Sequence, residues 1–216
     1  MRRNTLISLV VRIGEKLERV VSRFRWFWYS LLLQAPGCRI GARARVRGHE
    51  AIRIGRGFVS LEYLWLDAVR WYRGKSYNPS VAIGDRVIVG LGVHIGAIDR
   101  ITIGDDTLIG SRVTIIDHNH GDYGENSDHC LTPPTSRPLH SPGPIEIGSN
   151  VWIGDGVCVL GGVSIGPGSV IGANSVVTSN IPAGSLAVGS PCRVLRSFDE
   201  HTRQWSVLRK IEEANS

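Results

Sequence analysis

The chain has 216 residues and a formal net charge of +6, a length that suits one or two domains. The positive charge belongs to the first 47 residues, which carry eleven Lys/Arg against two Glu, so the remaining residues total −3 and favour no nucleic-acid partner. The four cysteines are scattered without a CxxC pair, which excludes a zinc-type spacing and indicates a reduced, cytoplasmic environment.

Residues 1–36 are predicted to form a basic, amphipathic helix. Its apolar residues recur at the spacings of three and four that are typical of one helical face. These residues are Leu6, Leu9, Val10, Ile13, Leu17, Val20, Val21 and Phe24. The apolar run 26–33 is shorter than the about 20 residues that span a bilayer, and it lacks a signal-peptide cleavage site. Residues 1–34 therefore suit peripheral contact with the inner face of a membrane, or packing against the first coil of the next domain.

Residues 37–196 carry a repeat of six residues, in which an aliphatic residue is followed by Gly. Two imperfect repeats begin the segment, and bulky aromatic residues between them either pack at its edge or line a groove. These aromatic residues are Trp65, Trp71, Tyr72 and Tyr77. The regular repeat then predicts an all-β fold: three short strands close a triangular coil of about eighteen residues, and the coils stack as a parallel β-helix. One interval, from Ile95 to Ile103, is eight residues long, which predicts a bulged corner near Asp99.

The repeat stops once, at an inserted loop over residues 117–144 that contains five prolines. Loops of this length in compact domains are usually functional or disordered. If Ile115 points into the coil, strand alternation places His118 and His120 together on the outside. Asp117 then faces the other way, so it is not expected to contact either imidazole. A histidine has an ordinary pKa of about 6.5, which suits a general base that takes a proton from a hydroxyl.

Three segments after the loop resemble the hexapeptide acyltransferases, in the branch that contains maltose and galactoside acetyltransferases. They are residues 145–154 (IEIGSNVWIG), 162–177 (GVSIGPGSVIGANSVV) and 181–196 (IPAGSLAVGSPCRVLR). Within that branch, residues 80–196 are most similar to O-acetyltransferases of lipopolysaccharide, capsule and exopolysaccharide synthesis. The resemblance implies a left-handed β-helix, a homotrimer with sites between subunits, and acetyl-CoA as co-substrate without a required metal. A short helical tail is expected over residues 197–216.

The resemblance also implies roles for single residues. His120 is the expected catalytic base, with His118 as its competitor. Residues expected to contact coenzyme A are Trp152, Asp155, Ala173, Thr178, Ser179, Arg193 and Arg196. Backbone N–H groups beside residues 152–155 are expected to bind the oxyanion of the tetrahedral intermediate. Where the family often has Thr-Lys-Asp, this chain has Thr178-Ser179-Asn180, so one cation near the coenzyme phosphates is missing. Arg193 and Arg196 would supply that positive charge instead.

The implied reaction is transfer of an acetyl group to a sugar hydroxyl of a cell-surface polysaccharide or its lipid-linked or nucleotide-linked precursor, without a covalent intermediate. Three alternatives remain at this point. A carbonic anhydrase of the same shape would need three histidines on a zinc ion. An antibiotic or small-sugar acetyltransferase would share the fold and the base. A non-catalytic scaffold would have no use for the histidine pair together with Trp152.

Overall fold

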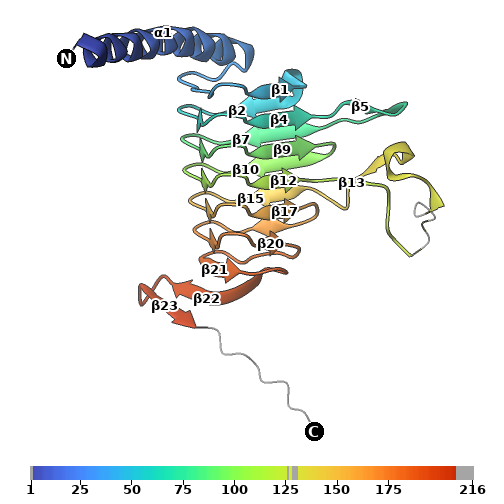
Figure 1. Cartoon of the computed structure of the whole chain (residues 1–216). Coiled ribbons are helices and arrows are strands. Elements are labelled where there is room, and N and C mark those ends of the chain that lie inside the picture. The colour runs from blue at the N-terminus through green and yellow to red at the C-terminus, as the bar shows by residue number, and fades with distance from the viewer. Residues whose placement is uncertain (1, 126, 128–130, 208–216) are drawn as a thin grey trace.

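The computed structural model describes residues 2–125, 127 and 131–207, with side chains from residue 12 onward. It is an all-β solenoid of three parallel sheets, with the helix α1 (Arg2–Leu32) at one end (Figure 1). Sheet 1 contains β1 (Arg45–Arg47), β4 (Trp65–Ala68), β9 (His94–Ala97), β12 (Thr114–Ile116), β17 (Cys158–Leu160) and β20 (Val176–Val177). Sheet 2 contains β2 (Ile52–Ile54), β7 (Ser80–Ile83), β10 (Arg100–Ile103), β15 (Ile145–Ile147) and β18 (Ser164–Ile165). Sheet 3 contains β3 (Val59–Ser60), β8 (Ile88–Val89), β11 (Leu108–Ile109), β16 (Trp152–Ile153), β19 (Val170–Ile171), β21 (Ser185–Val188), β22 (Arg193–Asp199) and β23 (Gln204–Val207).

The aliphatic positions of the repeat form the core of the solenoid. Ile83, Ile103 and Ile147 pair in register on successive strands of sheet 2, and each is at most 4% exposed. The same stacking fills the interior from Leu33 to Ala187 in one continuous cluster. Burying each such side chain stabilises the fold by about 1.5–3 kcal/mol relative to exposure. The prediction of a β-helix from the six-residue period is confirmed.

The corners explain the residues that follow each aliphatic position. A Cβ on Gly154 would lie 2.7 Å from the backbone nitrogen of Ala173 in the next coil, so only glycine fits there. The carboxylate of Asp155 accepts the Ser111 N–H at 2.7 Å, and this bond ties its corner to the preceding coil. Asn174 has a φ of 58°, in the left-handed region that asparagine tolerates at a tight corner.

The C-terminal part of helix α1, from residue 22, lies against the first coil through one face, whereas residues 12–21 extend beyond the coil and are exposed (Figure 1). Arg25 donates from Nε to the Ile40 carbonyl at 2.9 Å, and Leu33, just after the helix, is 4% exposed. The opposite face carries an exposed apolar stripe. Its residues are Ile13, Leu17, Val20, Val21, Phe24, Phe27, Trp28 and Leu31. No described helix of the chain is both long enough and apolar enough to cross a membrane.

Two excursions leave the coils on the same side of the solenoid (Figure 1). The first is a hairpin of β5 (Trp71–Tyr72) and β6 (Lys75–Ser76). The second, which we call the arm, is the inserted loop 117–144; it contains β13 (Asn119–His120), the 3-10 helix η3 (Pro134–Ser136) and β14 (Leu139–His140). The Tyr77 hydroxyl joins them, because it donates to the Leu139 carbonyl at 3.1 Å and accepts the Leu139 N–H at 2.9 Å.

The C-terminal helix expected over residues 197–216 is wrong for its described part. Residues 193–207 form an antiparallel hairpin of β22 and β23 that extends sheet 3 beyond β21. Phe198 and Trp205 are partners across the two strands, and their ring centroids lie 5.4 Å apart, a cross-strand aromatic contact that stabilises paired strands. Residues 208–216 lie outside the described part of the chain.

Candidate active site

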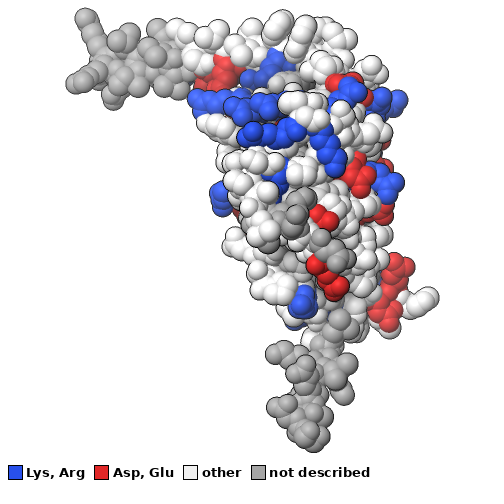
Figure 2. Space-filling view, turned by 90° about the vertical axis from the view of Figure 1, so that its right-hand side faces the viewer, with Lys and Arg blue, Asp and Glu red and all other residues white. Residues whose placement is uncertain are grey.

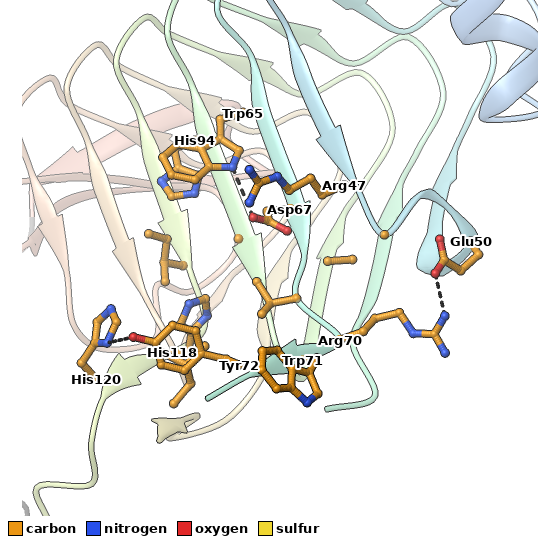
Figure 3. Close-up of a pocket in the computed structure, with 16 residues that line it drawn as sticks. Arg47, Glu50, Trp65, Asp67, Arg70, Trp71, Tyr72, His94, His118 and His120 are labelled. Carbon is orange, nitrogen blue, oxygen red and sulfur yellow. Dashed lines mark hydrogen bonds and ion pairs between the residues drawn. The ribbon is translucent and has the colours of Figure 1, made fainter. Parts of the chain in front are cut away.

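A cavity of about 630 Å³ lies where the hairpin, the arm and sheet 1 meet (Figure 3). Its floor is a row of paired residues on four successive strands: Arg47, Asp67, Gly96 and Ile116. Three histidines and three aromatic side chains contribute to the walls. They are His94, His118, His120, Trp65, Trp71 and Tyr72. Of the bulky aromatic residues whose place the sequence left open, three therefore line a groove, whereas Tyr77 fixes the arm.

Asp117 and His118 form a buried pair at one end of this cavity. Oδ1 of Asp117 lies 2.9 Å from Nδ1 of His118, and the two side chains are 0% and 13% exposed. The expectation that Asp117 would not contact an imidazole is therefore wrong. Alternation of side chains applies only to extended backbone, and β12 ends at Ile116, after which the chain bends.

The carboxylate of Asp117 is fixed from its other side by the bulged corner. It accepts the N–H of Ile98 at 2.9 Å and the N–H of Asp99 at 2.9 Å. The two extra residues predicted near Asp99 thus supply the donors that hold the carboxylate in place. A carboxylate offers only acceptor oxygens, so this contact favours the tautomer in which Nδ1 of His118 donates to Asp117 and Nε2 is left to accept a proton.

His120 lies on the same side of the chain as His118 but is held less firmly. Its side chain is exposed, and its Nδ1 lies 3.4 Å from the Tyr72 hydroxyl. The two rings meet edge to face, with centroids 5.5 Å apart. The Tyr123 hydroxyl donates to the backbone carbonyl of His120 at 2.8 Å. The structure thus brings both predicted histidines to one cavity, with a carboxylate contact for His118 and a phenol contact for His120.

His94 and Trp65 form the wall opposite the arm. Their rings stack with centroids 4.1 Å apart and an angle of 12° between the planes. Burial lowers the pKa of His94 below its ordinary value, partly offset by the Asp67 carboxylate and reinforced by His118. The Trp65 indole N–H donates to Asp67 at 3.3 Å. Burial of His94 therefore favours the neutral form of its ring.

A second cavity, of about 450 Å³, lies on sheet 3 between β16, β19 and β21. Three of the residues expected to contact coenzyme A meet there, namely Trp152, Asp155 and Ala173. Trp152 is 54% exposed. His118 follows β12 of sheet 1, whereas Trp152 belongs to β16 of sheet 3, and the two residues line different cavities.

The remaining expected coenzyme A contacts lie outside this cavity. Thr178 and Ser179 are exposed after β20, and Arg193 and Arg196 are exposed on β22. The backbone donors proposed for the oxyanion are partly wrong. The N–H groups of residues 152 and 154 already donate to carbonyls of the next coil at 2.9 and 2.8 Å, which leaves them unable to bind an intermediate.

Among the described residues, no group of three or more His, Cys, Asp or Glu side chains is arranged to hold a metal ion. Sequence reasoning missed Asp117, His94 and the charged residues of the first cavity. Only for Asp117 did the sequence offer a signal, since the eight-residue interval marks the corner that binds its carboxylate.

Two family models match the repeats. The model described as bacterial transferase hexapeptide (six repeats) matches residues 144–179, and that of the hexapeptide repeat of succinyl-transferase matches residues 100–121. An Escherichia coli (strain K12) protein, WbbJ, named as an O-acetyltransferase of lipopolysaccharide biosynthesis, is 40% identical over 163 residues, or 74% of this chain and 79% of WbbJ. The galactoside O-acetyltransferase of the same organism is 34% identical over 67% of this chain and 66% of that protein.

Solved structures show the same architecture. A hexapeptide-repeat acetyltransferase of Vibrio cholerae, complexed with acetyl coenzyme A, is 26% identical with a TM-score of 0.52, covering 80% of this chain and 76% of that chain. The N-acyltransferase AntD of Bacillus cereus has a TM-score of 0.61 at 20% identity over 78% of this chain and 84% of its own, which supports the fold alone. The chain belongs to the hexapeptide-repeat acyltransferases and has their left-handed β-helix. Because the sequence relatives are named acetyltransferases, the family favours an acyltransferase over the carbonic anhydrase and scaffold alternatives.

Proposed function

We propose that this protein is an acetyl-CoA-dependent O-acetyltransferase whose acceptor is a sugar hydroxyl of a cell-surface polysaccharide or its precursor. The observation that carries the proposal is the Asp117–His118 pair, which presents a base to a cavity lined by aromatic and charged side chains. The named activities of the two sequence relatives support O-acetylation, and the acetyl coenzyme A complex of the Vibrio cholerae structure supports the donor.

His118 is the base in this proposal, and His120 borders the acceptor. Nε2 of His118 takes the proton of the acceptor hydroxyl, and the oxygen attacks the thioester carbonyl of the donor. The tetrahedral intermediate then breaks its carbon–sulfur bond, and the imidazolium returns the proton to the leaving thiolate. Asp117 stabilises the imidazolium that forms between these two steps. The reaction is direct and forms no acyl-enzyme.

The donor is proposed to bind the second cavity of a neighbouring subunit in a homotrimer. An outward-facing apolar column on sheet 3 supports this arrangement, because Ile88, Leu108 and Trp152 pair in register and are 48%, 44% and 54% exposed. A second copy packed on this column would bring its own His118 to the donor. Thr178, Ser179, Arg193 and Arg196 would then contact the nucleotide end of coenzyme A, with the two arginines on its phosphates.

The stripe of α1 is proposed to contact the cytoplasmic face of the inner membrane. Arg12, Lys16, Arg19 and Arg23 follow one flank of the stripe at the three- and four-residue spacing of a helix. An exposed apolar face with a basic flank is typical of helices that lie in a membrane interface.

The experiment is acetyl transfer from acetyl-CoA to a panel of sugars, nucleotide sugars and aminoglycosides. His118→Ala should lower kcat by about 10²–10⁴-fold, whereas His120→Ala should mainly raise the KM of the acceptor. An inactive His120→Ala together with an active His118→Ala would contradict the assignment of the base. Turnover of aminoglycosides alone would favour the antibiotic acetyltransferase.

Complementation tests the shared site. Mixed trimers of His118→Ala and Trp152→Arg chains should recover activity, because some interfaces combine an intact His118 with an intact Trp152. In a cyclic trimer mixed at random from equal amounts of the two variants, about half of the sites have an intact His118, and about half of those meet an intact Trp152. Mixing therefore restores about one quarter of the sites. Each variant alone is the control, and inactive mixed trimers would contradict a site built from two subunits.

A further inference from the structure

The first cavity has two chemically different ends. The row Arg47–Asp67–Gly96–Ile116 crosses four strands, and strands lie about 4.8 Å apart, so the row is roughly 14 Å long. His118 lies at the β12 end. Arg47 lies at the β1 end, where Arg70 also enters the cavity, on the side from which α1 approaches (Figure 3).

The Arg47 end lies in the most basic part of the described solenoid. Residues 37–80 carry nine Lys/Arg and three Asp/Glu, whereas residues 81–207 carry seven and twelve. Figure 2 shows basic side chains gathered over the first coils, below α1. Three further exposed cations, Arg45, Arg73 and Lys75, belong to β1 and the hairpin. Such a region attracts an anionic ligand from solution or from a surface.

Two carboxylates also face this cavity. Glu50 accepts a hydrogen bond from Arg70 at 2.6 Å, but both side chains are about half exposed, and exposed pairs of this kind contribute only about 0–1 kcal/mol. Asp67 is buried and accepts the Trp65 indole N–H. Arg70 can therefore exchange its partner for a phosphate, which offers several oxygens to the planar guanidinium.

The helix supplies the second observation. Its apolar stripe points away from the solenoid, while its opposite face packs on the coil that begins sheet 1. A membrane beneath the stripe would therefore lie next to the Arg47 end of the cavity, and His118 would lie farther away. The order from membrane to base is apolar stripe, the two arginines of the β1 end, aromatic walls and His118.

We propose that the acceptor is a lipid-linked glycosyl diphosphate, with its diphosphate on Arg47 and Arg70 and its sugar between Trp71 and His118. This rests on the proposed function, whose acceptor it specifies. A row of roughly 14 Å has the scale of one monosaccharide joined to a diphosphate. Trp71 is 66% exposed on a hairpin whose base is fixed to the arm, which suits an aromatic surface for a sugar ring.

The test is flotation of the full chain with vesicles of phosphatidylethanolamine and phosphatidylglycerol, with and without undecaprenyl diphosphate. The diphosphate should increase binding about tenfold or more, the gain expected from a charge-assisted contact. Arg47→Gln with Arg70→Gln should reduce binding to the level of the plain vesicles, and Phe24→Glu should weaken binding to both kinds of vesicle. Arg100→Gln and Leu131→Glu are matched controls, since they make the same changes at exposed positions away from the cavity and the helix.

Equal binding with and without the diphosphate would overturn the proposal, as would full binding by the double arginine variant. Tight, arginine-dependent binding of free uridine diphosphate without vesicle binding would identify a nucleotide-linked acceptor instead. Flotation requires no acetyl transfer, and His118→Ala should float normally. The absence of acetyl transfer in the wild type would therefore contradict the proposed function and leave the flotation result standing.

Discussion

Replacing Asp117 with Asn tests the link between the bulged corner and the base. The carboxylate is completely buried and accepts three hydrogen bonds, from the backbone of Ile98 and Asp99 and from Nδ1 of His118. An amide of the same shape offers one oxygen and one NH2 group. The amide cannot accept hydrogen bonds from both the bulged corner and His118, so one of the three donors loses its acceptor.

The magnitude follows from this count. Losing one hydrogen bond to a charged group costs about 1.5–3 kcal/mol of folding free energy. If the amide oxygen stays on the corner, the NH2 group faces Nδ1 of His118 and moves the ring proton to Nε2. The base is then blocked, and the comparable change in serine proteases lowers kcat by about 10⁴-fold. We expect Asp117→Asn to lower kcat by about 10²–10⁴-fold with little change in the KM of the donor.

Three measurements decide this prediction. Acetyl transfer under saturating substrates gives kcat, urea unfolding gives the stability, and nitrogen-15 chemical shifts of the His118 ring give its tautomer. Asp99→Asn is the matched control, because this carboxylate is exposed at the same corner and should leave all three unchanged. A folded Asp117→Asn protein with kcat within about twofold of wild type would refute the proposed role of the pair.

Three further predictions concern the attachment of the arm and the His94 wall of the cavity. Tyr77→Phe removes both hydrogen bonds to the buried backbone of Leu139. It should therefore lower the free energy of unfolding in urea by about 1–3 kcal/mol and speed proteolysis of the arm. An unchanged rate of cleavage would contradict the fixing of the arm by Tyr77. The pKa of His94 is lower in the folded protein than in the unfolded chain, so the unfolded chain binds more protons than the folded protein near and below pH 6.5. The free energy of unfolding should therefore fall as the pH falls through that value. Asp67→Asn should lower the pKa of His94 further in an NMR titration, and an increase would contradict the electrostatic reasoning.

The sequence could predict the scaffold because each coil is a local unit with the same requirements. An aliphatic residue that repeats every six positions must point inward, and the glycine after it must pass close to the next coil, as Gly154 does. The C-terminal hairpin could not be predicted in this way. Residues 197–207 have no period, and their conformation is set by the pairing of β22 with β21 and of β23 with β22, which the sequence pattern does not reveal.

The site could be predicted only in part, for a related reason. The histidine pair was visible because it interrupts the repeat. Asp117 contacts His118 because the backbone bends after Ile116, and no alternation rule applies to a bend. The placement of Arg47 in one row with Ile116, just before these histidines, depends on the register between coils, which brings together residues far apart in sequence.

The site is built where the regular coil is broken. The bulged corner supplies the donors for Asp117, the hairpin supplies Trp71 and Tyr72, and the arm supplies the histidines. A regular coil satisfies its backbone groups with its neighbours, as the N–H groups of residues 152 and 154 do, and has none left for a ligand. New donors and new walls therefore require added residues, which a solenoid accepts at its corners without disturbing the buried column. On this argument, we expect the length and sequence of the hairpin and the arm to set the preference for the acceptor, while the bulged corner, through Asp117, fixes the position of the proposed base.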